Sequence, residues 1–104
     1  MGVNLKSVSM GVRQYEILKK LEREGTIVYN IKRMRKDHQH ELLVKLLSLE
    51  RSGFINVEFM GDKILVRKKN WWKSIRLKRI RGNYVWVRVY KNGKKIGKCE
   101  LQGI

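Results

Sequence analysis

Proline is absent from the 104 residues, and no segment is of low complexity or repeated. A disordered proline-rich tail of the kind that small adaptor domains bind is therefore excluded. No apolar run approaches the roughly 20 residues that cross a bilayer, and residues 1–10, MGVNLKSVSM, lack the features of a signal peptide or a myristoylation signal. We expect an unprocessed cytoplasmic protein without membrane contact.

Groups suited to catalysis are also few. Cys99 is the only cysteine and excludes an internal disulfide, which fits a reducing compartment. The only histidines, His38 and His40, are two residues apart, so on a helix they point about 200° from each other and do not chelate one metal ion. We therefore expect no enzyme, no metal site and no cofactor.

Acidic residues number nine against 25 lysines and arginines, which gives a net charge of +16. The charge is uneven: residues 1–36 carry nine basic and three acidic side chains, residues 37–69 six and five, and residues 70–104 ten and one. Self-repulsion at this density is costly unless a polyanion relieves it. The composition therefore indicates an acidic partner.

Three helices are expected in the first half of the chain. Apolar residues at three- and four-residue spacings predict a helix between Ser9, a candidate N-cap, and Gly25. Residues 26–36, TIVYNIKRMRK, are interpreted as a strand-like entry followed by a short second helix. A third helix is predicted from Asp37, as its N-cap, to Gly53. Its apolar stripe holds Leu42, Leu46 and Leu49, flanked by Leu43 and Leu47.

Alternating apolar residues predict strands in the second half. Residues 54–69, FINVEFMGDKILVRKK, are typical of a hairpin with its turn at residues 60–63. Three further antiparallel strands are expected in residues 70–104, with turns at Gly82-Asn83 and at Asn92-Gly93. The expected sheet is apolar on both sides, with Trp72 and Trp86 in the core, and a sheet of this kind together with the wide apolar arc of the third helix predicts a homodimer.

The junction between the third helix and the hairpin carries a motif. Leu46, Leu49, Glu50, Gly53 and the pair Phe54-Ile55 stand at the spacing L-x-x-L-E-x-x-G-F-I. Residues 12–69 thereby resemble the winged helix-turn-helix superfamily, and the size and charge resemble its small basic archaeal or archaeal-virus members. The resemblance implies an α+β fold: three helices plus a β-hairpin wing in residues 1–69, and a basic three-stranded antiparallel extension in residues 70–104.

The function that the resemblance implies is non-enzymatic binding of double-stranded DNA, by a transcriptional regulator or a DNA-coating protein at the nucleoid or, if viral, in the host cytoplasm. Its third helix would enter the major groove, presenting His38, Gln39, His40, Lys45 and Ser48. The wing and the segment before that helix would contact phosphates through Arg33, Arg35, Lys36, Lys63, Arg67, Lys68 and Lys69. The extension would add Arg76, Lys78, Arg79 and Arg81.

The alternative is an RNA-binding or ribosome-associated protein that uses the C-terminal strands. There, basic residues are interleaved with Trp71, Trp72, Tyr84, Trp86 and Tyr90. Rings that stack on bases and cations that pair with phosphates are typical of single-strand binders. A protein-interaction domain is the third class, and the net charge of +16 disfavours it.

Overall fold

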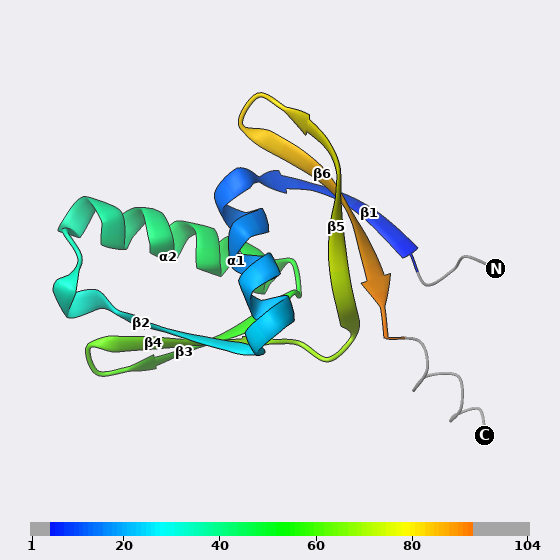
Figure 1. Cartoon of the computed structure of the whole chain (residues 1–104). Helices are drawn as coiled ribbons and strands as arrows, with labels where there is room; N and C mark the ends of the chain where they lie inside the picture. The colour runs from blue at the N-terminus through cyan, green and yellow to red at the C-terminus, as the bar shows by residue number, and fades with distance from the viewer. Residues whose placement is uncertain (1–4, 93–104) are drawn as a thin grey trace, which may run out of the picture. The chain divides into compact units, whose positions relative to one another are not determined.

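The computed structural model describes residues 5–92 (Figure 1), which form two compact units. Arg13–Lys69 makes the first, called here the helical unit, and both ends of the chain, Met1–Val12 and Asn70–Ile104, make the second, called the sheet unit. The described residues hold two α-helices, one 3-10 turn and six strands in two three-stranded antiparallel sheets. The fold is therefore α+β.

The helical unit alternates helices with the strands of one sheet. Its elements are α1 (Val12–Glu24), β2 (Thr26–Asn30), the 3-10 turn η1 (Ile31–Arg33), α2 (Lys36–Arg51), β3 (Ile55–Met60) and β4 (Lys63–Lys68). The strand order is β2-β4-β3, so the hairpin strand β4 is central. Residues on one face of this sheet and on the helices form a core that includes Leu18, Leu21, Ile27, Leu46, Leu49, Ile55, Ile64 and Val66.

Gly53 ends α2 in a left-handed conformation with φ of +88°. The amide of Gly53 donates to the carbonyl of Glu50 at 2.9 Å, and the amide of Phe54 donates to the carbonyl of Leu49 at 3.0 Å. These two bonds are the Schellman arrangement, and the side chains of Phe54 and Leu49 are both buried. The chain turns directly from the helix into β3.

Glu50 protects the open edge of β3. Its carboxylate accepts a hydrogen bond at 3.0 Å from the backbone amide of Val57. Strand β3 is hydrogen-bonded to β4 only, so its other side presents unpaired backbone groups. A charged side chain on such a group discourages pairing with another strand.

The sheet unit joins an N-terminal strand to a C-terminal hairpin. Strand β1 (Leu5–Gly11) pairs antiparallel with β6 (Tyr84–Lys91), which pairs on its other side with β5 (Trp72–Arg81). Because residues alternate between faces, Val85, Val87 and Val89 share one face of β6, and all are at most 2% exposed. The same face holds the buried Met10, Trp72 and Ile75.

The expected three-helix winged helix-turn-helix is wrong. Residues 26–35 contain no α-helix: Thr26–Asn30 is strand β2, and only the three-residue turn η1 lies between it and α2, which begins at Lys36. The alternation of buried Ile27 between exposed neighbours suits a strand that pairs with β4. The local pattern of this segment fits both a helix and a strand. The pairing with β4, whose residues lie nearly 40 positions further along the chain, decides in favour of the strand.

Two helix starts and one strand also differ from expectation. Ser9 is not an N-cap, because it lies within β1, and the N-cap of α2 is Arg35 rather than Asp37. The three-stranded extension is wrong as a purely C-terminal unit, since β1 supplies its third strand. The turn predicted at Asn92-Gly93 and the strand after it lie outside the described residues. The hairpin at residues 55–68 and the helix end at Gly53 are confirmed.

Candidate nucleic-acid interface

One side of the sheet unit exposes a row of rings along its central strand. Tyr84, Trp86, Arg88 and Tyr90 alternate along β6 with the buried valines and therefore point to the opposite face. Tyr84 is 61% exposed and Trp86 is 40% exposed. Large aromatics usually end up mostly buried, so two exposed rings on one strand form a surface suited to contact with a planar partner.

The neighbouring strand β5 supplies the cations. In the register of the sheet, Arg76 lies opposite Arg88, Arg79 opposite Trp86, and Arg81 opposite Tyr84. All three arginines of β5 are exposed. Each ring at the hairpin end of β6 is thus flanked by a guanidinium, which can pair with phosphate or stack on a base.

A β-bulge at Lys78 is what brings these arginines to one face. Leu77 pairs with Val87 and Arg79 with the next residue of β6, Trp86, so Lys78 is an extra residue in the ladder. Strict alternation from Arg76 would instead send Arg79 and Arg81 to the side of the buried valines. The bulge restores them to the side that carries the rings.

The third strand, β1, brings small residues. Ser9 lies opposite Trp86, Ser7 opposite Arg88, and Gly11 opposite Tyr84. Both serines are exposed. We call the set on this side of the sheet the aromatic–basic face: Ser7, Ser9, Arg76, Arg79, Arg81, Tyr84, Trp86, Arg88 and Tyr90.

No acidic residue occurs in the described segments of the sheet unit, residues 5–12 and 70–92, which hold eight lysines and arginines. No cation on the aromatic–basic face is therefore neutralised by a carboxylate from these described segments of its own unit. A surface of one sign attracts a polyanion over several ångströms and raises its rate of association.

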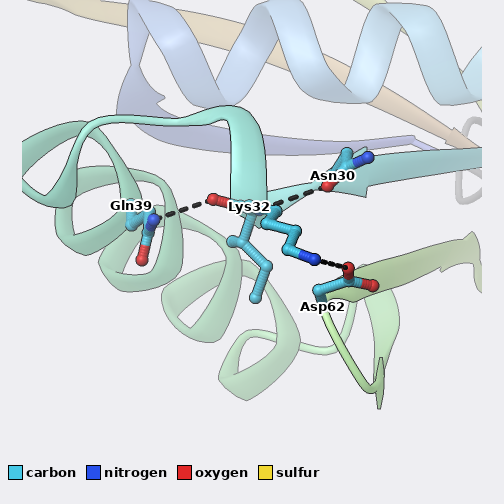
Figure 2. Close-up of polar contacts among 5 residues, drawn as sticks. Asn30, Lys32, Gln39 and Asp62 are labelled. Carbon is cyan, nitrogen blue, oxygen red and sulfur yellow. Dashed lines mark hydrogen bonds and ion pairs between the residues drawn. The ribbon is translucent and has the colours of Figure 1, made fainter.

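In the helical unit, the predicted site residues just before α2 lie on a braced turn. The amide nitrogen Nε2 of Gln39 donates to the carbonyls of Ile31 at 2.8 Å and Met34 at 2.9 Å. Lys32 Nζ lies 3.7 Å from a carboxylate oxygen of Asp62, in the β3–β4 turn (Figure 2). Both amide hydrogens of Gln39 are thereby used within the unit, so in this arrangement its NH2 group braces the turn.

The braced turn holds three exposed cations at the start of α2: Arg33, Arg35 and Lys36. Arg35 Nε is 3.7 Å from Asp37 Oδ1, with both side chains largely exposed. An exposed ion pair of this kind contributes at most about 1 kcal/mol, so it does not hold Arg35 away from an incoming phosphate.

The predicted residues further along α2 divide by exposure. His40 is exposed, and Ser48 is half-buried. His38 and Lys45 line a cavity of about 420 Å³ between α1 and α2, together with Arg13 and Lys20. Glu16 and Glu41 line the same cavity and offset most of its positive charge. The cavity is therefore a weaker candidate for an anion than the aromatic–basic face.

The hairpin residues of the predicted site differ in environment. Lys63 is exposed beside the turn, and Arg67 is exposed with its Nη2 3.9 Å from a carboxylate oxygen of Glu58. Lys69 is half-buried. Burial lowers the pKa of the Lys68 ammonium, against the opposing effect of Glu22, and its Nζ donates to the carbonyl of Lys69 at 3.2 Å. Lys68 thus acts mainly within the unit.

Part of the face could be predicted from the sequence. The sequence predicts contact with nucleic acid at four residues of β5: Arg76, Lys78, Arg79 and Arg81. In the structure all four lie on the strand next to the rings of β6. Trp72 is buried as expected, whereas the expected burial of Trp86 is wrong. Ser7 and Ser9 were missed, because their segment was not predicted to be a strand.

Two negative findings apply to the described part of the chain. Among residues 5–92, no three His, Cys, Asp or Glu side chains come together as a metal site would require. No helix within the same range is long and apolar enough to cross a membrane.

Comparison with known proteins adds no relative. No family model matches the chain, and neither a curated protein nor a solved structure matches it. The chemistry of the aromatic–basic face is therefore the basis for assigning a function.

Proposed function

We propose that the chain is a nucleic-acid-binding protein that acts by binding rather than by catalysis, and that the aromatic–basic face makes its principal contacts. One observation carries the proposal: exposed rings of β6 stand beside exposed arginines of β5 on a surface to which the described segments 5–12 and 70–92 contribute no acid. Cations supply the affinity for phosphates, and rings supply contact area for bases or sugars. Arg79 and Arg81 stand opposite its two most exposed rings, Trp86 and Tyr84.

Non-enzymatic action is supported by the residue types on the face. It consists of arginine, tyrosine, tryptophan and serine, and among its described residues none is an acid, a histidine or a cysteine. General acid–base catalysis near neutral pH uses groups whose pKa lies near the working pH, most often histidine. The face carries no such group.

The test is the salt dependence of binding by the whole chain and by the double variant Arg79→Gln/Arg81→Gln. The slope of log affinity against log salt changes by about 0.7 to 0.9 for each phosphate contact. The variant removes two such contacts, so its slope should be shallower by about 1.5 than that of the parent chain. Fluorescence anisotropy on a labelled oligonucleotide measures the slope.

The matched control is Lys20→Gln/Arg23→Gln on α1, which removes the same charge from exposed positions of the helical unit. The control should lower affinity slightly, because it lowers the net charge. It should leave the slope of log affinity against log salt close to that of the parent chain. Equal losses in the two double variants would show that net charge, and no particular face, governs binding and would contradict the proposal.

A second candidate is duplex DNA held by the helical unit. The observation that favours it is the braced turn, which presents Arg33, Arg35 and Lys36 together at the positive end of the α2 dipole. On this alternative, Arg33→Gln/Lys36→Gln should reduce duplex binding more than Arg79→Gln/Arg81→Gln does. The expected homodimer and the role in transcription stay predictions.

A further inference from the structure

The aromatic–basic face is asymmetric across its central strand. Trp86 lies between Arg79 on β5 and Ser9 on β1, and Tyr84 lies between Arg81 on β5 and Gly11 on β1. Apart from Arg88, which stands in the row of rings itself, the positive charge of the face thus lies on the β5 side of the rings and the small residues lie on the β1 side. A nucleic-acid strand has a similar asymmetry, with phosphates along one side and bases along the other.

The spacing of the rings indicates whether the bases that they bind are paired or unpaired. Tyr84 and Trp86, two apart on the strand, are separated by about 6.7 Å, and Trp86 and Tyr90, four apart, by about twice that distance. Bases in a duplex follow one another at about 3.4 Å along each strand. Inside a duplex, the flat faces of the bases are also covered by their neighbours. A strand that places one base on each ring must be unpaired and extended.

Ser74 provides a hydrogen-bonding group on the cationic side. It lies on β5 opposite Tyr90, in the register that carries Arg76, Arg79 and Arg81 further along the same strand. A serine hydroxyl both donates and accepts, as does the 2′-hydroxyl of ribose, whereas guanidinium only donates. A strand whose sugars follow the cations therefore offers Ser74 a sugar hydroxyl only if it is RNA.

We infer that the face binds single-stranded RNA along β6, with bases on Tyr84, Trp86 and Tyr90 and phosphates over the arginines of β5. This inference rests on the proposed function and deepens it, because it names the class of nucleic acid and its placement. The bases extend toward β1, where the hydroxyls of Ser7 and Ser9 meet their edges.

The experiment compares three labelled oligonucleotides of one sequence, about ten nucleotides long, against the full chain: single-stranded RNA, single-stranded DNA and the DNA duplex. The RNA should bind tightest, and the duplex should bind weakest. The preference for RNA over single-stranded DNA should be about three- to tenfold, as expected for one neutral hydrogen bond, and Ser74→Ala should remove it.

Ring stacking is tested at Trp86. Trp86→Leu should weaken binding of the single-stranded RNA by about fivefold to a hundredfold, the range expected for loss of one base–aromatic stack, and should leave the salt slope unchanged. Trp86→Phe keeps a ring and should retain most of the affinity. Because both substitutions are made at an exposed position, circular dichroism should show the same fold in both.

Three results would overturn the inference: a duplex that binds as tightly as the single strands, DNA that binds as tightly as RNA, or a Trp86→Leu variant with unchanged affinity. In each of these cases the chain still binds nucleic acid, so the proposed function stands. Failure of all three oligonucleotides to bind at low salt would remove the proposed function itself.

Discussion

The surroundings of Tyr29 change the pKa of its hydroxyl group. It lies on β2, half-buried, beside the cavity between α1 and α2. Burial disfavours the charged phenolate and raises the pKa of Tyr29 above its usual 10.0. The neutral hydroxyl is therefore the form that the folded chain stabilises.

Folding stability should consequently fall at alkaline pH. Between pH 10.0 and the raised pKa, Tyr29 is ionised more often in the unfolded chain than in the folded chain. The unfolded state then binds fewer protons, so the free energy of unfolding decreases as the pH rises through this window. Ultraviolet absorbance of tyrosinate should show one late ionisation that is absent from Tyr29→Phe, whose stability should depend less on pH above 10. A titration curve that Tyr29→Phe leaves unchanged would contradict this expectation.

Trp86 shows why single side chains were difficult to assign from sequence. Trp72 and Trp86 have the same size and hydrophobicity, yet the first is fully buried and the second is 40% exposed. On a strand, the face is decided by odd or even position relative to the buried residues, here the valines of β6. The identity of the residue carried less information than its place in the alternation.

At the scale of elements, the bulge at Lys78 determines where β5 puts its charge. Since the bulge is one extra residue, deleting Lys78 should leave a regular ladder in which Arg79 and Arg81 keep their present face. We expect this deletion to fold, with a Tm within a few degrees of the parent, and to retain binding.

The matched control is deletion of Arg88, which also removes one cation. Arg88 lies in β6, which is paired on both sides, so its loss shifts the register against β1 and β5 together. This variant should lose cooperative unfolding, measured by thermal circular dichroism. Equal tolerance of the two deletions would show that the ladder at Lys78 is not a bulge in solution.

Elements with local signals were predicted well. Gly53 required a positive φ, and it ended α2 where expected. The hairpin of β3 and β4 joins neighbouring segments through a short turn, which its alternation already indicated. Such features depend on residues close together in the chain, so one sequence suffices to find them.

Elements stabilised by distant partners were not predicted. In β1 only Val8 and Met10 alternate as apolar residues, and its partner β6 is at the other end of the chain. In β2, Ile27 fits both a helix and a strand until its pairing with Val66 is known. The local sequence therefore did not determine either strand. Because β1 was not predicted, its contribution to the aromatic–basic face was missed as well.

At the scale of the whole molecule, the net charge of +16 opposes folding. Five ion pairs, at 3.3 to 4.0 Å, are described between residues 5 and 92, and all have partly or largely exposed side chains. Such pairs contribute at most about 1 kcal/mol each and often less. Long-range repulsion should therefore outweigh them.

Salt should accordingly stabilise the chain. Between about 0.01 M and 0.15 M salt the Debye length shortens from roughly 30 to 8 Å, which screens repulsion between distant cations. The Tm should rise by several degrees, since 1 kcal/mol corresponds to roughly 4–8 °C for a small domain. Differential scanning calorimetry measures the change. A Tm that falls with salt would mean that the ion pairs dominate.

The pairing of β1 with β6 also orders events during synthesis. Ser7 and Ser9 leave the ribosome well before their partners Arg88 and Trp86, which are translated later than all of the helical unit. A sheet that joins such distant segments closes late and slowly. A nascent chain therefore has no assembled aromatic–basic face until β6 has emerged. If this face binds nucleic acid as we propose, shorter nascent chains do not compete with the folded protein for that ligand.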